Sequence, residues 1–132
     1  MSTERHEIKR ARLLDAPLLT FDLSTLLKEI KREQTWRKGT RNARTLLKGQ
    51  KLRMVLVAMH AGTLMESHRA DAPISFQVID GRLKFSTDSE SFILRKGQVL
   101  SLQAGIRHDV EALNESAFLL TLATSQSHPA ER

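Results

Sequence analysis

Gly62-Thr-Leu-Met-Glu-Ser-His68 and Gly97-Gln-Val-Leu-Ser-Leu-Gln-Ala-Gly105-Ile-Arg-His108 are the two stretches that decide the fold of this chain. Each begins at a glycine, which marks a turn, and ends at a histidine at the edge of a short apolar segment. Two histidines placed in this way can converge inside a small β-barrel and hold a metal ion, because imidazole is a good ligand for transition metals.

The sequence around these histidines has the period of β-strands. From residue 43 onward, apolar and polar residues alternate, and glycine-containing turn signals separate the segments. One of these signals, Asp80-Gly81, lies between two apolar segments and predicts a tight hairpin. The expected strands are residues 43–48, 53–61, 74–79, 82–86, 91–95, 99–102, 109–112 and 117–124.

The region before the strands has a helical pattern. Asp22 can cap a helix whose apolar side chains form one stripe, Leu23, Leu26, Leu27 and Ile30, and which ends before Gly39. We therefore divide the chain into an N-terminal arm and helix (1–42), a β-barrel (43–124) and a flexible tail (125–132). Eight short strands without long helices predict an all-β fold, with the jelly roll as a candidate.

Composition limits the classes of protein to which the chain can belong. Its 132 residues suffice for one domain and are few for two. It has no cysteine, so disulfides, thiolate metal ligands and a cysteine nucleophile are excluded. The longest apolar run, residues 54–59, is far shorter than the ~20 residues of a membrane helix. With no signal-peptide pattern either, we expect a soluble, cytoplasmic protein without a membrane partner.

The positive charge is concentrated in the first part of the chain. The net charge is +8 over residues 1–53 and −2 over residues 54–132. Seven of these cations can form one patch for an acidic partner: Arg37, Lys38, Arg41, Arg44, Lys48, Lys51 and Arg53. Because only Trp36 and Phe21 could stack on bases in this region, a solvated basic face is favoured over a nucleic-acid interface.

The two glycine–histidine frames resemble the two motifs of the cupin family, G-x5-H-x-H-x3,4-E-x6-G and G-x5-P-x-G-x2-H-x3-N. Gly62, His68 and Gly81 fit the first motif, and Gly97, Gly105 and His108 fit the second. The match covers about residues 53–123. The resemblance implies a double-stranded β-helix, that is, a jelly-roll barrel, commonly paired into a homodimer. We expect the helical stripe to provide the apolar face of that pairing.

Several positions depart from the family pattern. The second histidine of the first motif falls at Ala70, and its glutamate falls at Ile74. In the second motif, Gln103 replaces the proline and Ala112 replaces the asparagine. Of four typical metal ligands, only two histidines remain, whereas catalytic metal sites usually have at least three protein ligands.

The candidate site is a pocket with the two histidines at one end and an apolar lining. Its metal, where one binds, is zinc, iron, manganese or nickel, with Gln77 as the possible third ligand. Arg107, beside His108, could reach over the mouth of the barrel and contact a carboxylate ligand. In the alternative reading, the histidines are hydrogen-bonded to each other, to water or to a backbone carbonyl group. The predicted pocket residues are His68, Phe76, Val78, Leu100, His108 and Val110.

Three functions are compatible with these patterns. The first is a small-molecule-binding cupin-like protein with an incomplete metal site. The second is a metal-dependent enzyme of the dioxygenase or isomerase type that uses His68 and His108. The third is a non-enzymatic regulatory module that acts through its basic N-terminal segment. No hydrolase triad or phosphate-binding glycine loop is visible in the sequence.

Overall fold

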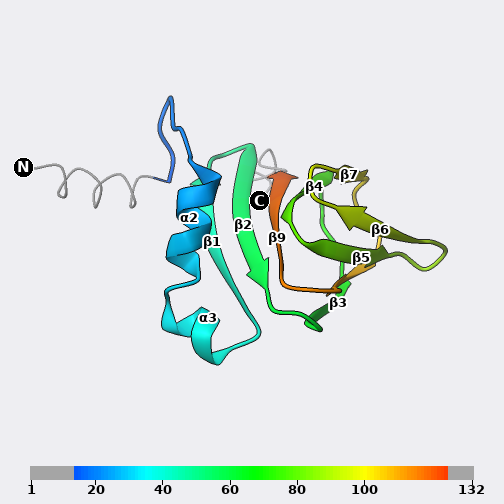
Figure 1. Ribbon diagram of the computed structural model, residues 1–132. Helices are drawn as coiled ribbons and strands as arrows, with labels where there is room; N and C mark the ends of the chain where they lie inside the picture. Colours follow the sequence, from blue (N-terminus) through cyan, green and yellow to red (C-terminus); the bar gives the residue numbers. More distant parts are fainter. Residues whose placement is uncertain (1–13, 125–132) are drawn as a thin grey trace, which may run out of the picture.

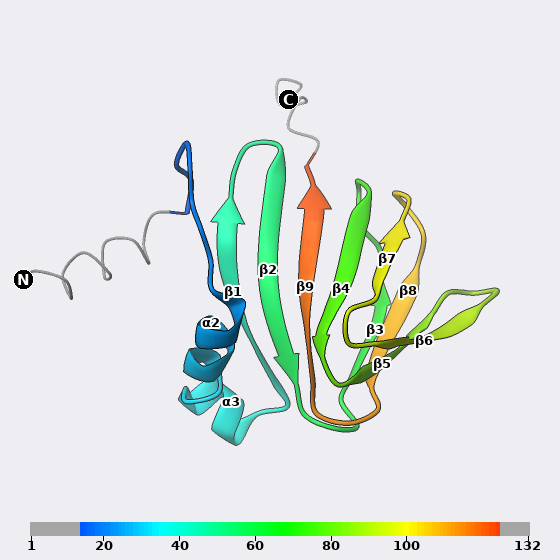
Figure 2. The ribbon, with the colours of Figure 1, turned by 45° about the horizontal axis from the view of Figure 1, so that its top comes forward.

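Two antiparallel β-sheets face each other and form the body of the protein (Figures 1 and 2). The computed structural model describes residues 14–124, apart from the side chains of Ser67 and His68. The larger sheet has the order β1 (Arg41–Lys48), β2 (Leu52–Met59), β9 (Ser116–Ala123), β4 (Ile74–Asp80) and β7 (Val99–Leu102). The smaller has the order β3 (Leu64–His68), β8 (His108–Ala112), β5 (Arg82–Ser86) and β6 (Ser91–Arg95).

This arrangement is the predicted all-β jelly roll with a short N-terminal helix. The two sheets share no strand, so they form an open sandwich and not a closed barrel. All eight predicted strands are present within one to two residues of their expected ends. A ninth, β3, was not predicted, because its five residues include the polar run from Glu66 to His68.

The predicted hairpin at Asp80-Gly81 is wrong. The backbone of Gly81 has a φ of +80°, as a tight turn requires, but β4 and β5 lie in different sheets. The chain crosses here from one sheet to the other, and β5 pairs with β6 and β8. A glycine-containing turn signal shows that the chain changes direction, but it does not determine which strand becomes the neighbour.

The main hydrophobic core lies between the two sheets. Alternation along β4 illustrates how the sequence produces it: Ile74, Phe76 and Val78 are buried, whereas Gln77 is exposed. Phe118 on β9 and Phe85 on β5 are almost completely buried in the same core. The two facing sheets therefore enclose a continuous apolar interior.

Two helices, α2 (Leu23–Ile30) and α3 (Gln34–Lys38), cover the outer face of the larger sheet beside β1 and β2 (Figure 1). The Asp22 side chain accepts a hydrogen bond from the backbone N–H of Thr25 at 3.2 Å, which confirms the predicted cap. The apolar stripe of α2 packs on Leu56 of its own chain, in a second core. The apolar stripe therefore packs against its own chain, so there is no longer a reason to assign it to a dimer interface. The homodimer itself stays a prediction.

The predicted helix does end before Gly39, but turn residues 31–33 divide it, so that its last part is a separate helix, α3, whose five residues are too few to be stable alone. Packing holds it in place. The buried indole ring of Trp36 stacks on the imidazole ring of His60, with centroids 3.5 Å apart. The Nε2 atom of His60 also lies 2.8 Å from the carbonyl oxygen of Trp36. Strand β2 thus fixes the helix through a histidine at its end.

The remaining predictions concern the two ends of the chain, a membrane-spanning helix and the location of the protein. The arm before residue 14 and the tail at 125–132 lie outside the described residues. Within residues 14–124, no helix has the length and apolar character needed to cross a bilayer. The cytoplasmic location stays a prediction.

Candidate ligand-binding site

A cavity of about 200 Å³ lies between the two sheets. Strands β2, β4 and β9 of the larger sheet line one side, and β3 and β8 of the smaller sheet line the other. The connection from β3 to β4 closes it with residues 69 and 70. Nine of the eleven lining side chains are apolar. The described residues of the lining are Val57, Met65, Arg69, Ala70, Ile74, Phe76, His108, Val110, Phe118, Leu120 and Leu122.

The structure brings together part of the predicted pocket. Phe76, His108 and Val110 line the cavity. Val78 is buried in the same core but does not reach the cavity lining. Leu100 lines a second hollow of about 410 Å³, which is more polar and lies near β6 and β7. Sequence alternation identified the inward-facing side chains correctly, but it could not determine where along the interior the space remains.

Contacts with Ile106, Phe85 and Phe76 help to fix His108 in the wall of the cavity. It is only 6% exposed, and its Nδ1 atom lies 3.0 Å from the carbonyl oxygen of Ile106. Its ring is stacked on Phe85 at a centroid distance of 5.2 Å and meets Phe76 edge-on at 5.9 Å. Because a carbonyl oxygen only accepts, Nδ1 donates a proton in this contact.

His68 and His108 lie opposite each other on two paired strands. Their Cα atoms are partners in the pairing of β3 with β8, after a register shift that follows Met65. The glycine frames in the sequence therefore did predict the convergence of the two positions. The imidazole ring of His68 lies outside the described part of the chain, so its role stays a prediction.

Two cavity residues stand where the family pattern has metal ligands. Ala70 and Ile74 fall at the positions of the second histidine and the glutamate, and both line the cavity. The family frame thus located the wall of the cavity correctly, but this chain has hydrocarbon there. Gln77, the suggested third ligand, is exposed, because it alternates with the buried Phe76 and Val78. It is therefore on the wrong side of β4 to complete a site.

The described donor set does not fit a metal centre. Among residues 14–124, with the His68 side chain outside the description, no three histidine, aspartate or glutamate side chains are grouped so as to hold a metal ion. His108 is the one histidine among the described residues of the cavity lining. A tight site normally needs at least three protein ligands, and the side chains of Ala70 and Ile74 cannot serve.

Arg69 is the residue that sequence analysis missed. The side chain of Arg69 lines the cavity, whereas the exposed Arg107, which the sequence suggested for the mouth, does not. The sequence did contain an indication that Arg69 lies at the site, since it stands directly between His68 and Ala70 of the first frame. Its loop is held by a hydrogen bond of 2.8 Å from the N–H of Gly105 to the carbonyl oxygen of Ala70.

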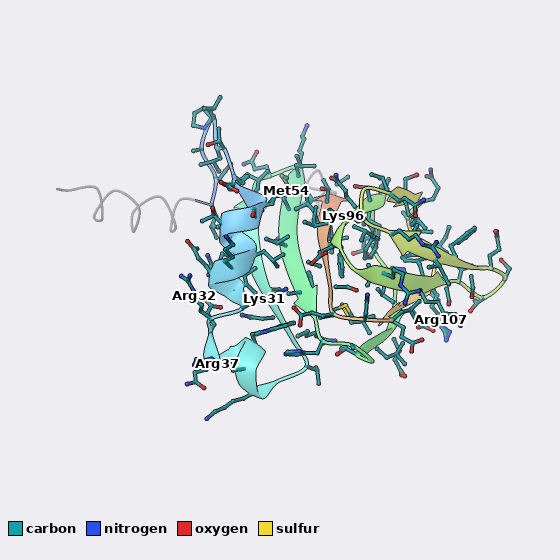
Figure 3. All side chains as sticks on the ribbon, viewed as in Figure 1. Lys31, Arg32, Arg37, Met54, Lys96 and Arg107 are labelled. Atoms are coloured by element: carbon teal, nitrogen blue, oxygen red, sulfur yellow. The ribbon has the colours of Figure 1, made fainter. Side chains whose placement is uncertain are left out.

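The basic segment does not form the predicted single patch. Arg41 pairs with Met59, and Arg44 pairs with Leu56, so the two arginines lie on opposite faces of the larger sheet. Arg44 is also paired with the carboxylates of Glu29 and Glu33 at 2.6 and 2.8 Å. Figure 3 shows Lys31, Arg32 and Arg37 on the helical side of the molecule, far from Arg107.

Comparison with known proteins supports the fold but not a particular activity. No protein-family model and no curated protein sequence matches the chain. A cupin superfamily protein from Desulfitobacterium hafniense is 13% identical, with a TM-score of 0.61, over 63% of this chain and 76% of that one. A cupin-2 domain protein from Shewanella frigidimarina is 16% identical, with a TM-score of 0.65, over 80% of this chain and 95% of that one.

A larger enzyme contains a similar unit. A variant of salicylate 1,2-dioxygenase from Pseudoaminobacter salicylatoxidans is 13% identical, with a TM-score of 0.75. The alignment covers 89% of this chain and 39% of the dioxygenase. At these identities the similarity shows architecture and not chemistry. Together with the two glycine–histidine frames, it shows that this chain has the cupin fold.

Proposed function

We propose that the protein binds a small, largely apolar molecule in the cavity between its two sheets. The observation that supports this proposal is the lining itself: among its described residues, nine apolar side chains surround about 200 Å³, and only Arg69 and His108 are polar. Small-molecule sites in proteins have this composition, with a few polar groups that orient the ligand.

The size of the cavity limits the ligand. Cavities for drug-sized molecules occupy about 300–1,000 Å³, whereas an apolar cavity of about 150 Å³ binds benzene. A space of about 200 Å³ therefore suits a single ring or a short branched chain. Nucleotides would be too large, and the apolar lining would leave the hydroxyl groups of a sugar without partners.

A second candidate is the metal-dependent cupin enzyme. One observation favours it, namely that the Cα atoms of His68 and His108 are partners across β3 and β8. It requires a third ligand, and the described residues do not supply one. We therefore place ligand binding first, and we assign no reaction to the cavity.

Titration with one-ring compounds, followed by NMR of the backbone amides, tests the proposal. The compounds are benzyl alcohol, benzamide and benzoate, and at least one should give saturable shifts around β4, β8 and β9. Ala70→Leu fills the cavity and should abolish the shifts. Ala43→Leu, on the exposed side of β1, is the matched control and should leave them unchanged. Absence of saturable binding by all three compounds would contradict the proposal.

A further inference from the structure

We infer that the ligand of this cavity is an apolar carboxylate, whose anionic end is bound by Arg69 while its hydrocarbon body fills the space between the sheets. The inference rests on the proposed function, and it goes beyond it by naming the chemical class of the ligand and the residue that selects it.

The first step is the charge of the cavity. Among the described lining residues, Arg69 is the one lysine or arginine, and none is an aspartate or glutamate. An uncharged apolar ligand would gain nothing from a guanidinium group at this place. A ligand with one negative charge would gain charge-assisted hydrogen bonds there, and a carboxylate matches the two parallel N–H groups of arginine.

The second step is that Arg69 is available. The ion pairs within the described residues join Lys31 to Glu115, and Arg44 to Glu29 and Glu33. Arg69 belongs to none of them, and Asp71, two residues further on, does not pair with it. Its side chain is exposed, so it stays hydrated until a ligand arrives, without the cost of a buried unpaired charge.

The third step is the position of Arg69 at the end of the cavity. It precedes Ala70, whose carbonyl group is held by Gly105, so the loop is tied to the turn before β8. Arg69 and Ala70 line the cavity together, and the remaining lining comes from the strands. A ligand can therefore keep its carboxylate in water-accessible contact with Arg69 and place its ring against Phe76 and Val110.

The described lining also disfavours ligands that carry more than one negative charge. The polar group that faces the ligand from the strands is His108, and its Nδ1–H is directed to the carbonyl oxygen of Ile106. One cation suits a monoanion. A phosphate ester, with more oxygens and up to two charges, needs more donors than the described residues of this lining supply.

Isothermal titration of the full chain with benzoate and benzamide tests the inference, because the two compounds have nearly the same shape and differ in charge. We expect benzoate to bind at least about tenfold more tightly than benzamide, as hydrogen bonds between charged groups allow. Raising the salt concentration should weaken only the binding of benzoate.

Three variants locate the effect. Arg69→Gln should reduce the affinity for benzoate to that for benzamide, and Arg69→Lys should restore part of it, since lysine keeps the charge but not the planar fork. Arg107→Gln is the matched control and should leave both affinities unchanged. A loss confined to Arg107→Gln would overturn the assignment to Arg69.

The outcomes separate the inference from the proposed function. Equal affinities for benzoate and benzamide, both lost in Ala70→Leu, would overturn the inference and leave ligand binding in the cavity intact. Binding of benzoate that survives Ala70→Leu would place the anion outside the cavity and overturn the inference as well. Absence of binding by both compounds would overturn the inference together with the proposed function.

Discussion

The imidazole ring of His108 lies nearly parallel to the phenyl ring of Phe85, with their centroids 5.2 Å apart and their planes inclined by 11°. Together with the contact from Nδ1 to the carbonyl oxygen of Ile106, this stacking makes His108 part of the apolar core as well as of the cavity wall. Packing and this hydrogen bond both contribute to the position of the ring.

The first prediction concerns metal content. Protein purified without added metal should contain well below one equivalent of zinc, iron, manganese or nickel, because the described cavity offers too few ligands for tight binding. Elemental analysis by mass spectrometry checks this, with the His108→Ala variant as the control. One equivalent of metal in the parent protein that disappears in His108→Ala would contradict it.

The second prediction is that two substitutions create a metal site. Ala70→His combined with Ile74→Glu places the two missing family ligands in the lining of the cavity, to which His108 also contributes. We expect the affinity for Zn²⁺ or Ni²⁺ to rise at least about tenfold above that of the parent, since each further ligand strengthens coordination. Competition with a chelating dye measures it.

The same double variant has a predicted effect on stability. Ile74 is only 6% exposed, so the glutamate should destabilise the metal-free protein, as burial disfavours an unpaired charge. Added Zn²⁺ should restore the melting temperature, because a ligand that binds the native state stabilises it. Adding His108→Ala should remove both the gain in affinity and this recovery. Unchanged affinity in the double variant would mean that the family frame does not locate the ligand positions.

The sequence alone predicts only part of this fold. Alternation at Ile74, Phe76 and Val78 predicted which side chains point inward, because strand periodicity is a local property. The two frames also predicted that positions 68 and 108 meet. Pairing across the sheets is not local, so the sequence could not show that Asp80-Gly81 joins two sheets.

The functional part of the site was harder to predict for a related reason. Whether a residue lines a cavity depends on where packing leaves space, and several elements determine this together. Val78 is buried without reaching the cavity, whereas Arg69, in a loop, does reach it. The sequence contained Arg69 beside a predicted ligand, but no periodic pattern indicates the direction of a loop side chain.

The third prediction is a pH dependence of stability at Glu33. The pKa of this carboxyl group lies below its ordinary value of 4.5, first because the Asn42 amide donates a hydrogen bond to it at 2.8 Å. Arg44 also lowers this pKa through a hydrogen bond and its charge, whereas partial burial opposes the shift. A lowered pKa in the folded state means that the stabilisation is present above the unfolded pKa and is lost as pH falls through the folded pKa.

Urea unfolding of Glu33→Gln between pH 7 and pH 3 checks this sign. The variant should be less stable than the parent at pH 7, by up to about 1 kcal/mol, because the ion pair is half exposed to solvent. The difference should shrink as the pH falls below about 4.5. Glu90→Gln, which removes an exposed carboxylate in no ion pair of the described residues, should show little difference. A gap that grows on acidification would refute the assignment.

The last prediction compares two glycines that share a backbone conformation. Gly81 and Gly97 have φ values of +80° and +87°, where a side chain is strained. A Cβ atom at Gly97 would meet nothing within 4 Å. A Cβ atom at Gly81 would lie 2.3 Å from the carbonyl oxygen of Glu115 and 2.4 Å from Oγ of Ser116.

Gly97→Ala should therefore cost about 1–2 kcal/mol of unfolding free energy, the strain of the backbone alone. Gly81→Ala should cost about 1–3 kcal/mol more, because the backbone of β9 must move where the chain crosses between the sheets. Both can be measured by urea unfolding followed through the fluorescence of Trp36, the one tryptophan of the chain. Equal losses in the two variants would show that the crossing at Gly81 tolerates a side chain. The crossing between the sheets would then depend on the backbone conformation of Gly81 and not on the close approach of β9.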